Sequence, residues 1–265
     1  MKVYKTHFLE KESDITIISE SKSAILKAKK IFYLHRGNLE KYVLKNDQFL
    51  TSFSPINVNT DLRIIKKMAV AAELCDVGPM AAVAGALADL MLEAMINPDE
   101  KEGSNYITAK IALVENGGEL AIDSIKPMNV ALFAGNNELN LNIGFLIEKK
   151  DCPIGIGTSS ATVGHAISFG QADAVTIFAK NAALADAAAT RVANAVKGED
   201  IEKSIKKGLD LVDDLDGVIG TFISREDKIG QAGKIPKLVK IEGDKRYILR
   251  EKLDDASLGD FEIFK

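Results

Sequence analysis

The stretch Gly155–Asn194, GIGTSSATVGHAISFGQADAVTIFAKNAALADAAATRVAN, leads from glycines and hydroxyl-bearing residues through a short strand into an alanine-rich helix. The run Ala172–Ala179 is mostly apolar, which is typical of a buried strand. Asn181 is a suitable N-cap for a helix that extends to about Val196, because its side-chain oxygen can accept a hydrogen bond from the first turn. This stretch therefore predicts a buried strand joined to a helix.

The residues before this strand have the composition of a ligand site. Glycine permits positive φ and close approach of the backbone, and hydroxyl groups can contact phosphate or ribose oxygens. The glycines are Gly155, Gly157, Gly164 and Gly170, and the hydroxyl groups belong to Thr158, Ser159, Ser160, Thr162 and Ser168. This composition predicts a site for a bulky anionic ligand.

The predicted helix carries a carboxylate and a hydroxyl at helical spacing. Asp186 and Thr190 are four residues apart, so both project from one face. An Asp and a Thr at this spacing can share Mg²⁺, which prefers oxygen ligands and fills its other positions with water or substrate phosphates. An ordinary half-buried helix with unrelated polar residues is the competing interpretation, since such pairs are common.

The remaining pattern predicts an α+β fold in which antiparallel sheets pack against helices, rather than alternating β–α–β units. One domain is expected over residues 1–265, or two intimately packed lobes. Helices are expected at 21–44 with a break near Gly37, and at 62–73, 80–95 and 199–214. Strands are expected at 2–9, 13–19, 107–114, 119–125, 130–135, 141–147, 218–223, 238–241 and 247–250. The four runs between 107 and 147 are expected to form one antiparallel block, and Lys228–Pro236 an exposed loop.

Composition narrows the classes of function. The 265 residues carry a formal charge of −4, which gives no electrostatic reason to expect nucleic acid as a partner. No signal peptide or membrane-spanning run is apparent, so we expect a cytoplasmic protein without a membrane partner. Cys75 and Cys152 are too few for a disulfide scaffold and lack zinc-site spacing. Each is expected to be a small buried residue.

Three motifs carry family information: the helix reads ALADAAATRVAN, the segment Gly78–Gly85 reads GPMAAVAG, and Asn116–Gly118 reads as a Gly-Gly turn. Together they resemble the ApbE-like superfamily and, more specifically, its UPF0280 branch. ApbE enzymes are Mg²⁺-dependent FAD:protein FMN transferases. The resemblance therefore implies an ApbE-like fold, a flavin nucleotide (FAD or FMN) or similar diphosphate as the ligand, and a protein acceptor if transfer occurs.

The resemblance also implies roles for individual residues. Asp186 and Thr190 match the metal-holding Asp-x-x-x-Thr motif, and His165 is the nearest counterpart of a histidine beside the reacting phosphate. The implied cofactor-binding residues are Gly78, Met80, Gly117, Gly118, Thr158, Ser159, Ser160 and Gly164. Two features depart from the transferases: no Asp-Pro follows His165, and Val83-Ala84-Gly85 stands where they have a Lys-Gly pair.

Other interpretations stay open. Asn-Gly-Gly is a hairpin signal by itself, Gly-Pro is common at helix starts, and a lone histidine is often structural. The departures favour an accessory protein of anaerobic sulfur metabolism, such as sulfide assimilation, or of redox metabolism, which kept the fold without transferase chemistry; Cys75 would be its sulfur-handling group. A homo-oligomeric scaffold whose alanine-rich helices pack against another subunit is the third interpretation.

Overall fold

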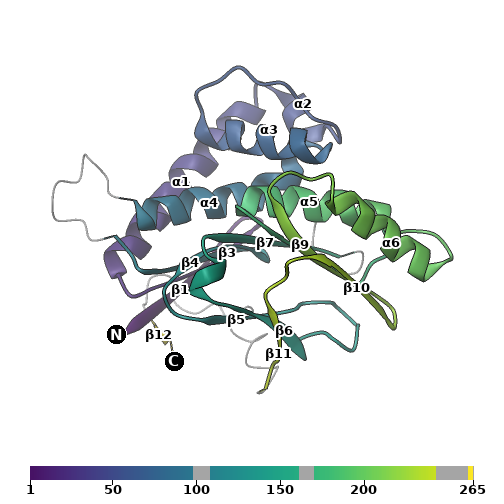
Figure 1. Cartoon of the computed structure of the whole chain (residues 1–265). Helices are drawn as coiled ribbons and strands as arrows, with labels where there is room; N and C mark the ends of the chain where they lie inside the picture. The colour runs from purple at the N-terminus through teal and green to yellow at the C-terminus, as the bar shows by residue number, and fades with distance from the viewer. Residues whose placement is uncertain (98–107, 161–169, 243–261, 265) are drawn as a thin grey trace.

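The computed structural model describes residues 1–97, 108–160, 170–242 and 262–264 and shows two antiparallel sheets with a layer of helices (Figure 1). The strands are β1 (Val3–Glu10), β2 (Ser13–Ser19), β3 (Ile111–Asn116), β4 (Glu119–Ser124), β5 (Met128–Ala131), β6 (Ile143–Ile147), β7 (Ile154–Ser159), β8 (Ala174–Ala179), β9 (Val218–Arg225), β10 (Lys228–Gly233), β11 (Lys237–Lys240) and β12 (Glu262–Phe264). The helices are α1 (Lys22–Val43), α2 (Asp47–Thr51), α3 (Arg63–Cys75), α4 (Val83–Ile96), α5 (Ala182–Ala195) and α6 (Ile201–Val212), with short 3₁₀ helices η1 (Pro79–Ala82) and η2 (Lys149–Asp151).

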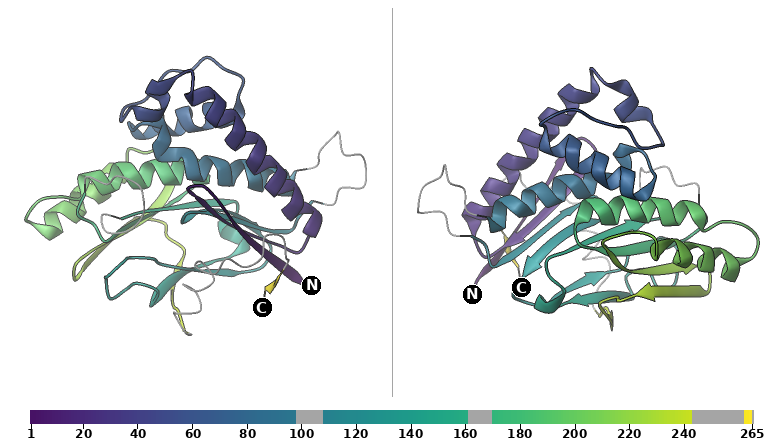
Figure 2. Two further views of the ribbon diagram at one scale, coloured as in Figure 1. Left: turned by 180° about the vertical axis from the view of Figure 1, so that it is seen from behind. Right: turned by 45° about the horizontal axis from the view of Figure 1, so that its top comes forward.

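The large sheet separates two hydrophobic cores. Its nine strands follow the order β10-β9-β8-β7-β4-β3-β2-β1-β12, and the small sheet follows β11-β6-β5. Helices α4, α5 and α6 lie across one face of the large sheet, with α1 to α3 stacked above them (Figure 2). The small sheet packs against the opposite face, where Phe145 contacts Phe178 and Phe222 at centroid distances of 4.8 and 5.8 Å.

Alternation along the central strands decides which side chains can reach each core. In β8, Val175 and Ile177 join the core under the helices, whereas Ala174 and Phe178 join the core between the sheets. Successive residues of a strand point to opposite faces, so neighbouring positions in one motif are separated by the whole thickness of the sheet. This constraint decides which predicted site residues can act together.

Most of the predicted elements are present. The first hairpin, the helices and the Asn181 cap are confirmed, and the Asn181 side chain accepts a hydrogen bond from Leu184 N at 2.9 Å. Helix α1 continues through Gly37, so the expected break is wrong. The expected loop 228–236 is also wrong, because Lys228–Gly233 forms edge strand β10. The strand expected at 247–250 lies outside the described residues.

One prediction about the sheets needs correction, and one strand was not predicted. The expected four-stranded block is divided, with β3 and β4 in the large sheet and β5 and β6 in the small one. The glycine- and hydroxyl-rich start of the opening stretch, to which no secondary structure was assigned, is strand β7. Strand β7 alternates β-branched residues with Gly155 and Gly157, because the helix above it leaves no room for side chains at these two positions.

The segment Pro79–Ile96 is long and apolar enough to span a membrane, but most of it is buried inside this fold. It packs between the large sheet and helices α1 and α5, where it contributes to the core.

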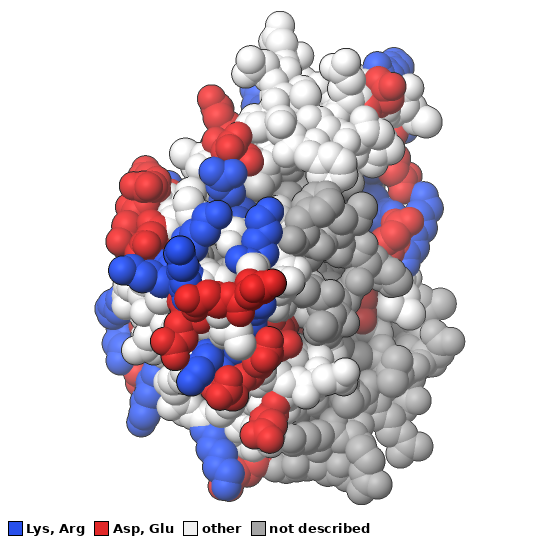
Figure 3. All heavy atoms as spheres, turned by 90° about the vertical axis from the view of Figure 1, so that its right-hand side faces the viewer, with Lys and Arg blue, Asp and Glu red and all other residues white. Residues whose placement is uncertain are grey.

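At the other end of the helix layer, α6 exposes Lys203, Lys206 and Lys207 beside Glu202 and Asp210. Charges of both signs intermix on the face at that end of the molecule (Figure 3), as expected for a solvated helix face.

Candidate functional site

Four segments converge at one end of the large sheet. Strand β4 pairs with β7 with Leu120 opposite Ile156, so the turn before β4 lies at the same end as the residues after Ile156. The Asn116 side chain at this turn donates a hydrogen bond from Nδ2 to Ala84 O at 3.1 Å, which places the start of α4 there. Helix α5 lies over the same part of β7. This end of the sheet therefore gathers the start of α4, the β3–β4 turn, the end of β7 and the first turns of α5.

Glycines bring α5 into backbone contact with its neighbours. A Cβ atom at Gly155 would lie 2.0 Å from the Asn181 carbonyl carbon, and one at Gly157 would lie 2.7 Å from Asp186 N. On the other side of α5, a Cβ at Gly85 would lie 2.2 Å from Ala182 O. The close approach that Gly155 and Gly157 permit is thus to the helix that carries Asp186.

Helices α4 and α5 are connected by two carboxylates, each of which accepts hydrogen bonds from backbone amides at the start of the other helix. Asp89 of α4 accepts hydrogen bonds from Ala182 N at 2.8 Å and Ala183 N at 3.0 Å. Asp186 of α5 accepts one from Gly85 N at 2.9 Å. Each carboxylate satisfies amide groups at the start of the other helix, where the helix dipole favours negative charge. The pair fixes the position of Asp186 relative to α4.

Replacing Asp89 by Ala is expected to lower the free energy of unfolding by about 3 kcal/mol, because it removes a buried cap as well as a partner of Lys67. Asp89 is only 5% exposed, and its carboxylate lies 3.6 Å from Lys67 Nζ. Urea unfolding would measure the loss. The matched control is Asp200→Ala, which removes the exposed cap of α6 and should cost about 1 kcal/mol. Equal costs at the two sites would contradict the buried capping role.

Burial dominates the electrostatics of Asp186. The residue is half-buried, and burial has the largest effect on its carboxyl group. Burial raises the pKa of Asp186 to about 7, with the nearby Asp89 adding a further increase and the hydrogen bonds from Gly85 and Ala84 opposing it. No ion pair to Asp186 occurs within the described residues. A buried carboxylate with this environment is stabilised by an added cation.

The predicted hydroxyl ligands fall on two faces of the sheet. The Thr158 hydroxyl lies 3.0 Å from the Thr176 hydroxyl. Alternation places these two threonines on the face of the small sheet and Ser159 on the face of α5, together with Gly157. Thr190 is half-buried on α5, one turn after Asp186, and Ser160 is half-buried just beyond β7. Gly164 and His165 lie outside the described residues.

The other predicted contacts surround the start of η1 and the β3–β4 turn. Gly78 precedes η1 and packs against Ser52, whose carbonyl oxygen would lie 1.9 Å from a Cβ at Gly78. The half-buried Met80 packs at the edge of the helix-side core. Gly117 and Gly118 have φ values of +68° and +118°, which suit a tight hairpin turn. Gly117 is exposed and Gly118 is half-buried, so this turn borders the site without being enclosed by it.

The donor set fits Mg²⁺ only if the ligand supplies further oxygens. The described residues contain no group of three or more His, Cys, Asp or Glu side chains able to hold a metal ion. Asp186 and Thr190 offer one carboxylate and one hydroxyl, and Mg²⁺ commonly combines so few protein ligands with water and substrate phosphates. The uncompensated carboxylate of Asp186 supports this fit, with a phosphorylated ligand completing the coordination.

Sequence reasoning missed three charged residues that lie on α5 or contact it. It assigned no role to Asp89, Arg191 or Asp76. Arg191 Nη1 donates to Asp76 Oδ2 at 3.0 Å. The expected burial of Cys75 is confirmed, and burial raises the pKa of its thiol to about 12. Cys152 is only half-buried. Arg191 directly follows the predicted metal ligand Thr190, so the sequence offered a signal for it. Asp76 and Asp89 are brought to α5 only by the fold.

Comparison with known proteins identifies the class of protein. The structure is similar to the flavin transferase ApbE from Vibrio cholerae, with a TM-score of 0.56 and 13% identity over 87% of this chain and 96% of that one. A family model described as AbpE bacteria matches residues 2–221. The chain therefore has the ApbE-like fold, an α+β arrangement of antiparallel sheets packed with helices, as the sequence predicted.

Sequence relatives define the family more narrowly. The UPF0280 protein MJ1526 of Methanocaldococcus jannaschii is 41% identical over 254 residues, covering 95% of this chain and 98% of the relative. A UPF0280 protein of Methanobrevibacter smithii is 37% identical over 210 residues, covering 78% of this chain and 84% of the relative. The chain belongs to the UPF0280 family within the ApbE-like superfamily, which confirms the resemblance stated from its motifs.

Proposed function

We propose that this protein binds a flavin nucleotide such as FAD, or a similar diphosphate, together with Mg²⁺ at the corner formed by α4, α5 and the end of β7. The observation that carries the proposal is the Asp186 carboxylate, which is held by Gly85 N, which burial destabilises in its charged form and which has no ion-pair partner within the described chain. The name of the similar protein from Vibrio cholerae, a flavin transferase, supports the choice of ligand.

Different residues of this corner would bind the metal and the phosphate groups. Asp186 and Thr190 would hold the metal, and the Ser159 hydroxyl on the same face of β7 would be available to phosphate oxygens. The reciprocal caps hold Asp186 in place before the ligand arrives, which lowers the entropy lost on binding. When bound, Mg²⁺ would neutralise charge on the diphosphate.

Transfer of FMN to a protein acceptor is the reaction we propose for this site. His165 is the candidate proton-handling residue, as the resemblance implies. The proposal also allows a second candidate function, an accessory protein that binds the ligand without transfer, because the Asp-Pro after His165 is missing. A version that uses the Cys75 thiolate is disfavoured by the raised pKa of that thiol, since the thiolate is the reactive form.

Isothermal titration of the purified protein with FAD, once in Mg²⁺ and once in EDTA, tests the proposal. The preparation is first examined by absorbance for co-purified flavin. We expect binding in Mg²⁺ that is lost in EDTA, because the diphosphate completes the coordination of the metal. Absence of both flavin and binding would contradict the nucleotide site. Binding without FMN transfer to any acceptor would favour the accessory function.

A further inference from the structure

Helix α5 presents a basic residue beside the proposed metal ligands. Its half-exposed residues after the cap are Asp186, Thr190, Arg191 and Asn194, and its other residues are buried. Thr190 and Asn194 lie between Asp186 and Arg191 around the helix, since each residue advances the helix by about 100°. Arg191 is therefore part of the same accessible sector of α5 as the predicted metal site.

A second observation links Arg191 and Asp186 to the same end of α3, which packs against α5. Both groups act on the Cys75 thiol at the end of α3, where the charge of Arg191 lowers the pKa and that of Asp186 raises it. The thiol is buried and 1% exposed, so only groups near the end of α3 can affect it strongly. Arg191 and Asp186 therefore both lie near enough to the end of α3 for their charges to act on the same thiol.

Asp76 holds Arg191 without enclosing it. Asp76 ends α3 in the left-handed region, with φ of 50° and ψ of 52°, which Asp tolerates better than most residues. The Arg191 and Asp76 side chains are 38% and 69% exposed, and ion pairs this exposed contribute little to stability. An incoming anion can therefore replace the Asp76 carboxylate at little cost.

We propose that Arg191 is a phosphate-binding residue, positioned by Asp76 in the free protein and transferred to the diphosphate of the ligand on binding. The guanidinium presents a planar set of donors that matches phosphate oxygens. This inference rests on the proposed function, because it assigns the phosphate part of the same ligand to Arg191. It also gives Asp76 a role as a competitor for Arg191, which a purely structural ion pair would not have.

The test is titration of FAD in Mg²⁺ into the full chain and into the variants Arg191→Gln and Asp76→Asn. We expect Arg191→Gln to weaken FAD binding by about 10- to 100-fold, because it removes charge-assisted hydrogen bonds to phosphate. Asp76→Asn should strengthen binding by up to about fivefold, because it frees Arg191 and Asn also tolerates the left-handed region. Inorganic pyrophosphate, as a competitor of FAD, should show the same two changes.

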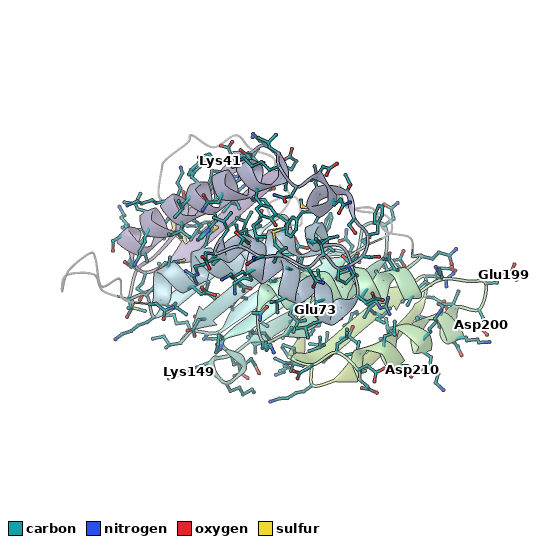
Figure 4. All side chains as sticks on the ribbon, turned by 90° about the horizontal axis from the view of Figure 1, so that it is seen from above. Lys41, Glu73, Lys149, Glu199, Asp200 and Asp210 are labelled. Carbon is teal, nitrogen blue, oxygen red and sulfur yellow. The ribbon has the colours of Figure 1, made fainter. Side chains whose placement is uncertain are left out.

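Two control variants separate this role from general charge effects. Lys149→Gln makes the same charge change as Arg191→Gln at an exposed residue of η2, and Glu73→Gln neutralises an exposed acid of α3 close in sequence to Asp76. In the view onto the helix layer, Lys149 is labelled at the edge of the molecule and Glu73 over the helices (Figure 4). Both controls should bind FAD as the wild type does, and thermal melting should show all four variants folded.

The outcomes distinguish the inference from the proposed function. If the wild type binds FAD but Arg191→Gln binds it equally well, the inference is wrong and the proposed function stands. Equal weakening by Arg191→Gln and Asp76→Asn would show a structural ion pair and would also overturn the inference. If the wild type binds neither FAD nor pyrophosphate, the proposed function and the inference both fail.

Discussion

The variant Asp186→Asn is expected to lose Mg²⁺-dependent FAD binding and, at the same time, to unfold at a higher temperature than the wild type. The Asn side-chain oxygen can still accept the hydrogen bond from Gly85 N, which the Asp carboxylate accepts at 2.9 Å. The variant removes only the buried negative charge, which is costly without a cation. A gain in stability that accompanies a loss of binding is typical of a functional residue.

The same variant should change how stability depends on pH. The pKa of Asp186 is raised to about 7 in the folded protein, above its ordinary value, so the folded state holds a proton that the unfolded state has lost. Stability from this residue therefore falls as pH rises from about 4 to about 7. The advantage of Asp186→Asn over the wild type should grow over that range. Urea unfolding in EDTA at several pH values would measure it.

Asp200→Asn is the matched control for this effect. Asp200 caps α6 by accepting a hydrogen bond from Lys203 N at 3.0 Å, and it is exposed to solvent. Asp and Asn are about equally good caps, so this variant should leave stability nearly unchanged across the same pH range. A loss of stability in Asp186→Asn at every pH would show that the charge of Asp186 serves the fold. Retained metal-dependent binding would show that it does not hold the metal.

The second large effect is expected at Gly85. Replacing a helix-interior Gly by Ala usually stabilises a protein by about 0.5–1 kcal/mol. At Gly85 the new Cβ would lie 2.2 Å from Ala182 O and 2.8 Å from Ala183 N, and these are backbone atoms that cannot rotate away. Helices α4 and α5 would have to separate, which strains the hydrogen bonds of Asp89 and Asp186 as well. We expect Gly85→Ala to lower the free energy of unfolding by about 3 kcal/mol.

Gly37→Ala provides the control, because the two changes should have opposite signs. Gly37 lies inside α1, and no atom would approach within 4 Å of a Cβ there. This substitution should raise the free energy of unfolding by about 0.5–1 kcal/mol. Urea unfolding of both variants gives the comparison. A stabilising Gly85→Ala would mean that α4 and α5 are not in backbone contact.

Local patterns were sufficient to predict most elements. Asn181 marks the start of α5 because its side chain satisfies an amide of the first turn, an interaction between residues close in sequence. The first hairpin and the Gly117–Gly118 turn follow for the same reason, since their geometry depends on neighbouring residues. Strand β7 was not predicted, because its glycines are required by the helix that packs on it. Local strand preference does not include such a tertiary contact.

By itself, the sequence determined the α+β class, the ApbE-like resemblance, the start of α5 and the shared helical face of Asp186 and Thr190, all of which depend on short spacings. Only the tertiary structure placed Asp89 on the amides of α5 and Asp186 on an amide of α4, because these partners are about a hundred residues apart. It also assigned Thr158 and Ser159 to opposite faces of β7 and joined Arg191 to Asp76. Such contacts depend on how elements pack, which no local pattern encodes.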